Sequence, residues 1–298
     1  MSHFSVLVIG EDPESQLAPY HEFECTGVDD QYVQDIDITD EVREQIGKDG
    51  QTLVEALEES GLDKKIVESE SLVDREEAHK YGYAIVRNGE LLKAVNRTNP
   101  NKKWDWYQLG GRFTGSFKLK GGNDGRRGEP GLMTEAVPHG YADQARKGAI
   151  DFIGMQDEAE DKARQLYHRF YEVLGKNAMP RSWAAVRGDF PGNIEAARNA
   201  YHEQPGIKAI QKHDEFRWYN DVVVEFNRSE DDYVKLARNR AVSSFAVVKD
   251  SQWYERGQMG WWAIVLDEKD EERWHEEMAK LVEAADDDTL FSMFDCHI

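Results

Sequence analysis

The fold is decided near the C-terminus, where residues 221–249 read DVVVEFNRSEDDYVKLARNRAVSSFAVVK. The two apolar ends of this stretch, residues 221–226 and 245–249, are rich in valine and phenylalanine, which favour β-strands. Between them, Ser229 and Asp232 have the spacing of a capping box, which predicts the start of a helix. The stretch therefore predicts a strand, a helix and a second strand.

The same alternation continues to the end of the chain. A strand is predicted at residues 261–266 (WWAIVL), an amphipathic helix at residues 270–284 and a final strand at residues 289–295. The resulting order, β-α-β-β-α-β, is that of the ferredoxin-like split βαβ fold. We therefore expect the fold class to be α+β, with a ferredoxin-like C-terminal unit over residues 215–298.

Residues 1–214 are expected to form an N-terminal α+β region with long insertions. Residues 4–9 (FSVLVI) predict a buried strand, and if this strand joins the C-terminal sheet the chain is one continuous domain. Residues 83–95 (YAIVRNGELLKAV) predict a hairpin, because Asn88-Gly89 supplies two residues that tolerate positive φ between apolar runs.

Helices are also predicted in this first region. Residues 157–174 have apolar side chains at three- and four-residue steps, which is typical of an amphipathic helix. A shorter helix is predicted at residues 193–202, with Asn193 as its cap. A third helix should begin near Asp40 and be broken in two by the glycines of the sequence GKDG.

The composition of the 298-residue chain limits its environment and its partners. Its formal charge of −21 disfavours non-specific binding to nucleic acid or to anionic membranes, but it permits a basic protein partner. Two cysteines provide no disulfide framework, and no stretch has the pattern of a signal peptide or a membrane span. These features predict a soluble cytoplasmic protein, in the host cytoplasm if a phage encodes it.

The segment at residues 101–130 (NKKWDWYQLGGRFTGSFKLKGGNDGRRGEP) differs in charge from the rest of the chain. Between Lys102 and Arg127 it contains seven cations and two anions, a net charge of +5. Its aromatic rings, arginines and glycines suit a ligand that carries both a ring and a phosphate, such as a nucleotide. The residues expected to bind this ligand are Trp104, Trp106, Tyr107, Gly110, Gly111, Arg112, Arg126 and Arg127.

Each part of this segment also has a structural interpretation. The aromatic residues suit the core of a sheet equally well, and a strand is predicted over residues 112–120. Arg126 and Arg127 would close the glycine-rich loop at residues 121–131 over an anion, or the loop is only a surface connector. The segment matches neither GxxxxGK[ST] nor GxGxxG, so it is not a phosphate-loop motif.

The C-terminal sequence DCHI places a carboxylate, a thiol and an imidazole at the end of a predicted strand. Alternation would put Asp295 and His297 on one face and Cys296 on the other. In an enzyme, Asp295 would orient His297 for proton transfer and Arg112 would stabilise negative charge; the alternative is a structural histidine. We expect no metal and no other cofactor, because no zinc-binding spacing is formed by His21, Cys25, Cys296 and His297.

Acidic runs occur at several predicted helix starts. One interpretation is a surface that mimics the phosphates of DNA toward a basic host protein. The other is a set of solvated helix faces, because the helix dipole favours acidic residues in the first turn. The runs lie at residues 68–70, 157–161, 230–232, 268–272 and 286–288.

Four stretches resemble those of an uncharacterised family of phage- and bacterium-encoded proteins: MSHFSVLVIG, KWDWYQLGGRFTG, RGQMGWW and the C-terminal DCHI. The resemblance implies a phage accessory origin, and it implies that residues 104–112, 259–261 and 295–297 converge on one pocket. Trp261 is expected in a second wall of that pocket or, alternatively, in the core. The resemblance implies no reaction.

The leading hypothesis is a protein that sequesters or processes an anionic, nucleotide-like small molecule. The alternative is an acidic interaction protein or DNA mimic that inhibits a basic host factor, and a third hypothesis is a scaffold without a ligand. Whether the protein is an enzyme is left open by the sequence, as is its oligomeric state.

Overall fold

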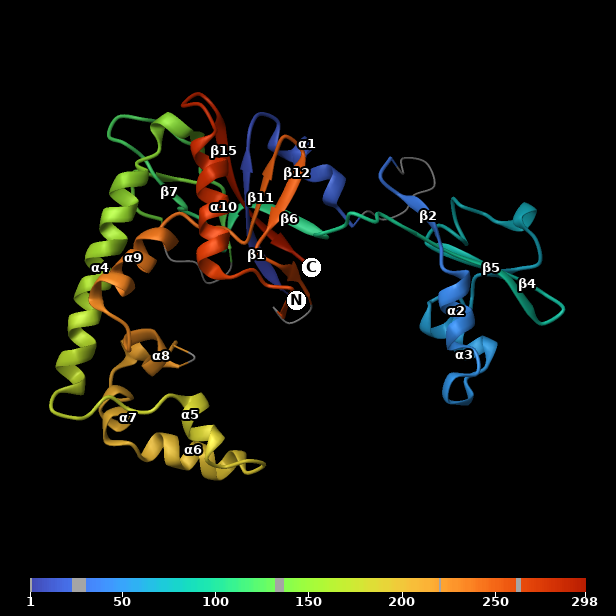
Figure 1. Ribbon diagram of the computed structural model, residues 1–298. Helices are drawn as coiled ribbons and strands as arrows, with labels where there is room; N and C mark the ends of the chain where they lie inside the picture. The colour runs from blue at the N-terminus through green and yellow to red at the C-terminus, as the bar shows by residue number, and fades with distance from the viewer. Residues whose placement is uncertain (1, 23–30, 132–136, 220, 261–263) are drawn as a thin grey trace.

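The computed structural model describes residues 2–22, 31–131, 137–219, 221–260 and 264–298, and it has a mixed α+β fold. Figure 1 shows three parts: a central sheet with α10 (Glu271–Glu283) beside it, a group of helices that follows α4 (Phe152–Leu174), and a small sheet with two helices built from residues 34–98. The first and last strands of the chain both lie in the central sheet.

The central sheet has seven strands and is organised around β15 (Leu290–His297). The antiparallel partner β1 covers one edge, in register from His3↔His297 to Ile9↔Phe291. On the other edge, β10 pairs with the first half of β15 and β6 with the second half. The other strands of the sheet are β1 (His3–Ile9), β6 (Trp106–Gly111), β8 (Glu129–Pro130), β10 (Gln144–Arg146), β11 (Ala246–Lys249) and β12 (Gln252–Glu255).

The predicted N-terminal strand joins the same sheet as the C-terminal strands. β1 lies between β15, to which it is antiparallel, and β11, to which it is parallel. Its sequence is almost continuously apolar because the strand is buried on both faces. The sheet thus combines strands from both sides of the expected boundary between residues 214 and 215.

The expected ferredoxin-like unit is not formed by the residues that the structure describes. Residues 221–226 are not a strand: they contain the helix α8 (Val222–Phe226), whose cap Asp221 accepts a hydrogen bond from the Val223 N–H. A short apolar run is compatible with a strand or a buried helix, and here packing against α4 decides for the helix. In addition, β1 and β11 are direct parallel neighbours, whereas the split βαβ arrangement separates such strands.

The predicted strand at residues 261–266 is confirmed only in part by the described residues. Only β14 (Val265–Leu266) is a strand within the described residues, and it pairs with β13 (Gln258–Met259) outside the central sheet. Residues 261–263, which include Trp261, lie outside the described part of the chain. The predictions for the last helix and strand are confirmed by α10 and β15.

The small sheet contains the predicted hairpin. Asn88 and Gly89 have φ of 53° and 79°, as a tight turn between two twisted strands requires. The strands pair in the order β2-β5-β4-β3, and the predicted break in the preceding helix is confirmed by two separate helices. These elements are β2 (Gln34–Asp37), β3 (Ile66–Val67), β4 (Gly82–Arg87), β5 (Glu90–Thr98), α2 (Thr39–Gln45) and α3 (Leu53–Glu59).

The helical part packs around an aromatic cluster. The rings of Phe170 on α4 and Phe226 on α8 stack with centroids 4.4 Å apart, and both side chains are fully buried. The helix predictions at residues 157–174 and 193–202, and the helix that Ser229 caps, are confirmed. The remaining helices of this part are α5 (Trp183–Gly188), α6 (Ile194–Glu203), α7 (Pro205–Ile210) and α9 (Glu230–Arg240).

Two hydrophobic clusters cover the two faces of the central sheet. On one face, Trp274 and Met278 of α10 pack against Phe291 and its neighbours. On the other face, Leu17 of α1 (Pro13–Leu17) and Trp104 pack in the cluster that includes Phe294.

The predicted strand over residues 112–120 is reduced to β7 (Phe117–Lys118), which pairs with β9 (Tyr141–Ala142). None of the described helices is long and apolar enough to cross a membrane.

We expect Phe170→Ala to lower the free energy of unfolding by about 3–5 kcal/mol, because it opens a cavity in a fully buried aromatic cluster. Ile153→Ala on the same helix is the matched control, because Ile153 is 67% exposed and its loss should cost about 0.5 kcal/mol or less. Urea denaturation measures both values. Equal losses in the two variants would contradict the packing described here.

Candidate functional site

The histidine and the carboxylate predicted to form a pair lie on the same face of β15, but each binds another partner. Nδ1 of His297 lies 2.7 Å from Oδ1 of Asp105, and Nδ1 of His3 lies 2.8 Å from Oδ1 of Asp295. The expectation that Asp295 orients His297 is therefore wrong. The sheet register explains this, since His3 lies directly opposite His297, and the Asp105 N–H donates to the His297 carbonyl oxygen.

The two imidazoles lie side by side at the end of the sheet, with ring centroids 5.0 Å apart. Nε2 of His297 is buried and has no hydrogen-bond partner among the described residues. Only 13% of the His297 side chain is exposed, so access to this nitrogen is restricted. Cys296 lies in the core on the opposite face, as alternation predicted, and burial raises the pKa of its thiol. A thiol in such surroundings is a poor nucleophile.

The glycine pair that was expected to approach a ligand anion instead approaches two carboxylates of the protein itself. Gly110 and Gly111 have φ of 76° and 53°, which side chains rarely adopt. A Cβ on Gly110 would lie 2.6 Å from Oδ2 of Asp143, and one on Gly111 would lie 2.5 Å from Oδ2 of Asp295. Both carboxylates are almost completely buried. The absence of side chains here thus lets the loop pack against internal anions.

Asp143 organises the loops on either side of this glycine pair. Its carboxylate accepts hydrogen bonds from the Thr114 hydroxyl at 2.9 Å and from the backbone N–H groups of Gly115 and Gly128 at 2.5 and 2.8 Å. The Arg112 N–H donates to Oδ2 of Asp295 at 2.9 Å. The amides of this segment therefore bind anions as its sequence suggested, but these anions are buried side chains of the chain itself.

The predicted aromatic residues occupy three different environments. Trp104 is buried and stacks on His21, with ring centroids 4.3 Å apart. Tyr107 is half-buried, and burial followed by the nearby Glu14 carboxylate raises the pKa of its hydroxyl. Trp106 is 45% exposed. Of these three rings, that of Trp106 is the most exposed and the most accessible for stacking on a ligand.

The arginines predicted to bind the ligand also differ in whether their side chains are free to contact an anion. The Arg127 guanidinium donates to the carbonyl oxygens of Tyr141 at 2.9 Å and Pro138 at 2.7 Å, so it fastens the loop rather than closing over an anion. The side chains of Arg112 and Arg126 are exposed and make no hydrogen bond or ion pair within the part of the chain that is described. Arg126 lines the groove described next, whereas Arg112 does not.

Two adjoining cavities, of about 900 and 330 Å³, form a groove between α1 and β6. They share Glu14, Trp106 and Tyr107. We call them together the α1–β6 groove; its charged and aromatic lining consists of Glu11, Asp12, Glu14, His21, Trp104, Asp105, Trp106, Tyr107, Arg126, Arg127, Glu129 and Phe294. The motifs expected to converge do so only in part: Trp104, Tyr107, Met259 and Cys296 meet in one hydrophobic cluster, and of these four only Trp104 and Tyr107 also line the groove.

The charge of the α1–β6 groove is opposite to that of the segment from which β6 comes. Glu11 forms an ion pair with Arg146, and Asp105 is bound to His297. Three other carboxylates in the groove, those of Asp12, Glu14 and Glu129, have no ion pair within the described residues. Among the described residues that line the groove, Arg126 is the one arginine without a hydrogen bond or ion pair of its side chain, because Arg127 is bound to carbonyl oxygens. Asp12 and Glu14 come from the segment after β1, so the basic sequence of residues 101–130 alone did not predict an acidic groove.

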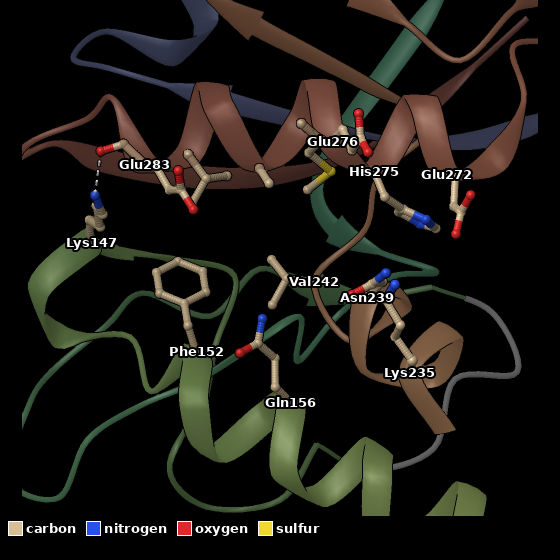
Figure 2. A pocket seen from close by; sticks show the side chains of 13 residues that line it. Lys147, Phe152, Gln156, Lys235, Asn239, Val242, Glu272, His275, Glu276 and Glu283 are labelled. Carbon is tan, nitrogen blue, oxygen red and sulfur yellow. Dashed lines mark hydrogen bonds between the residues drawn. The ribbon is translucent and has the colours of Figure 1, made fainter. Parts of the chain in front are cut away.

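A further cavity of about 490 Å³ lies between α4, α9 and α10 (Figure 2). Its walls are apolar, with Phe152, Val242 and Met278 among them. His275 projects into it from α10, and Nδ1 of this imidazole is buried without a hydrogen-bond partner in the described chain. No sequence motif marks this site; the one sequence signal near it is the amphipathic pattern of residues 270–284, to which Met278 belongs.

No arrangement of three or more potential metal ligands occurs in the described residues. Cys296 and His297 lie on opposite faces of β15, which prevents them from holding one ion together. Cys25 lies outside the described part of the chain.

We expect Gly111→Ala to lower the free energy of unfolding by about 2–4 kcal/mol, because the new Cβ adopts a positive φ and also meets the Asp295 carboxylate. Gly122→Ala is the control: its φ is 82°, but its Cβ would have no atom within 4 Å, so it should cost only about 1 kcal/mol. Thermal or urea denaturation gives both values. A Gly111 variant as stable as the Gly122 variant would contradict the close approach to Asp295.

No protein-family model matches the chain, and no curated protein or solved structure matches it either. The resemblance to phage- and bacterium-encoded proteins therefore stays a prediction, and the function must be inferred from the chain's own geometry.

Proposed function

We propose that the protein is an acidic interaction protein that binds a basic segment of a partner protein in the α1–β6 groove. The observation that carries this proposal is the set of three groove carboxylates, on Asp12, Glu14 and Glu129, that have no ion pair within the described residues. They line a cavity whose wall includes the half-exposed ring of Trp106.

A lysine- or arginine-rich segment fits this combination on chemical grounds. Carboxylates attract ammonium and guanidinium groups, and the face of a tryptophan ring binds the same cations through its quadrupole. The net charge of −21 adds a long-range field that attracts a basic partner and repels nucleic acid. If the phage origin suggested by the resemblance is correct, the partner is a basic factor of the host, whose action the bound protein would block.

The first test measures binding of a labelled peptide of alternating lysine and serine by fluorescence anisotropy. We expect the triple variant Asp12→Asn, Glu14→Gln, Glu129→Gln to bind about tenfold more weakly, since each lost contact of an exposed carboxylate is worth up to about 1 kcal/mol. Binding should also weaken as salt is added, because exposed charges are screened.

The matched control removes the same number of charges far from the groove. Glu44, Glu58 and Glu59 are exposed on α2 and α3 and have no ion pair in the described chain, so their change to glutamine should alter binding about twofold or less. Equal losses of affinity in the two triple variants would show that peptide binding depends only on the net charge of the protein. That result would overturn the groove as the binding site.

A nucleotide-like anionic ligand remains a second candidate for the same groove. It is favoured by a specific observation: Trp106, Tyr107 and Arg126, three of the residues proposed from the sequence, line the larger cavity together. In this alternative the ring stacks on Trp106 and the phosphate binds Arg126. The three unpaired carboxylates oppose it.

A thermal-shift screen of mono-, di- and cyclic nucleotides tests this second candidate. If it is correct, one nucleotide raises the melting temperature in a saturable manner, and Arg126→Ala abolishes the shift because it removes the phosphate partner. Arg112→Ala, which changes an exposed arginine outside the groove, should leave the shift intact. The absence of any shift across the nucleotide series would reject this candidate and leave the basic-peptide proposal untouched.

A further inference from the structure

The cavity between α4, α9 and α10 has the size and lining of a small-molecule site. Its volume of about 490 Å³ lies in the range of ligand pockets, which are mostly apolar with a few polar groups. Phe152 of α4, Val242 after α9 and Met278 of α10 form the apolar surface, and the polar groups lie around it (Figure 2).

One nitrogen of a histidine that lines this cavity has no hydrogen-bond partner among the described residues. His275 is 9% exposed, its Nε2 lies 3.3 Å from the Ser243 hydroxyl, and its buried Nδ1 has no hydrogen bond to any described residue. Burial lowers the pKa of this imidazole, which keeps it neutral and able to accept a hydrogen bond. A buried polar atom without a partner is unfavourable, and a ligand N–H would satisfy it.

Side chains of opposite charge lie on either side of His275. Lys235 rises from α9 toward the ring, and Glu272 lies beside it on α10 (Figure 2). Neither side chain forms an ion pair within the described residues, and they do not pair with each other. Glu276 and Glu283 also line the cavity, whereas the Lys147 ammonium is already bound to the carbonyl oxygens of Glu283 and Ala285.

We propose that this cavity binds a small zwitterion with an apolar body, the chemistry of an apolar or aromatic α-amino acid. The side chain of the ligand packs on Phe152, Val242 and Met278. Its ammonium group donates hydrogen bonds to His275 and Glu272, and its carboxylate pairs with Lys235. Because the cavity shares no lining residue with the α1–β6 groove, this site and the proposed peptide site can succeed or fail separately.

The experiment compares three probes of one shape on the full-length protein by isothermal titration calorimetry. L-Phenylalanine carries both charges, phenethylamine only the cation and 3-phenylpropionate only the anion. We expect saturable binding of phenylalanine, and binding about fivefold weaker for each singly charged probe, because each has lost one charge partner. Lack of saturable phenylalanine binding, or equal affinity for phenethylamine, would overturn the proposal.

Charge variants assign the two ends of the ligand. Lys235→Gln should weaken phenylalanine and phenylpropionate but leave phenethylamine unchanged, and Glu272→Gln should weaken phenylalanine and phenethylamine but leave phenylpropionate unchanged. Both residues are exposed on helices, so the fold tolerates these changes. Uniform effects of either variant on all three probes would contradict the assignment.

Two tryptophan substitutions test whether the ligand binds in this cavity. Ala279 is an exposed residue of α10 that lines the cavity, so Ala279→Trp should fill the cavity and abolish phenylalanine binding. Ala284→Trp introduces the same side chain at the exposed residue that caps the C-terminal end of α10. Ala284 does not line the cavity, so this variant should bind phenylalanine as tightly as the unaltered protein. Unchanged binding in the Ala279 variant would place the ligand elsewhere and reject this site.

Discussion

The structure depends on the pairing of β15 with three other strands. β1 runs antiparallel to it over its whole length and so joins the two ends of the chain, while β10 and β6 divide its other edge. A buried strand of this kind needs a partner for every backbone N–H and C=O group, and only folded neighbours supply them. Both candidate sites follow from this pairing: β6 brings Trp106 to the groove, and α10, which lines the other cavity, packs against the face that Phe291 occupies.

The electrostatics of the central body result from internal neutralisation more than from the net charge of any segment. Residues 101–130 are basic, yet the amides of Arg112, Gly115 and Gly128 are bound to Asp295 or Asp143, and the Arg127 guanidinium is bound to carbonyl oxygens. Such contacts use donors that would otherwise be free to bind an external anion. The segment after β1 adds the carboxylates of Asp12 and Glu14, which have no ion pair within the described residues. The negative charge of the groove therefore depends on how the folded chain brings these side chains together, and this charge favours a basic partner over a nucleotide.

The two proposed sites are suited to different kinds of ligand because their surroundings differ. The α1–β6 groove is open, polar and acidic, which suits an extended basic segment with many weak contacts. The cavity between α4, α9 and α10 is smaller and has apolar walls, and its buried imidazole can select a single hydrogen-bond donor. The helices that form it come from both the helical part and the central body. A ligand bound there would contact both parts and so stabilise their arrangement.

The elements that could be predicted from the sequence are those whose signals are local. The hairpin at Asn88-Gly89, the helix capped by Ser229 and the alternation of Asp295 and Cys296 across β15 all depend on neighbouring residues, and all are confirmed. The helix at residues 222–226, in contrast, depends on tertiary contacts, because packing on α4 outweighs the strand preference of valine. The tertiary structure also decided which carboxylate meets which histidine and which charges remain unpaired. Those outcomes depend on contacts between residues far apart in the chain, which no local pattern encodes.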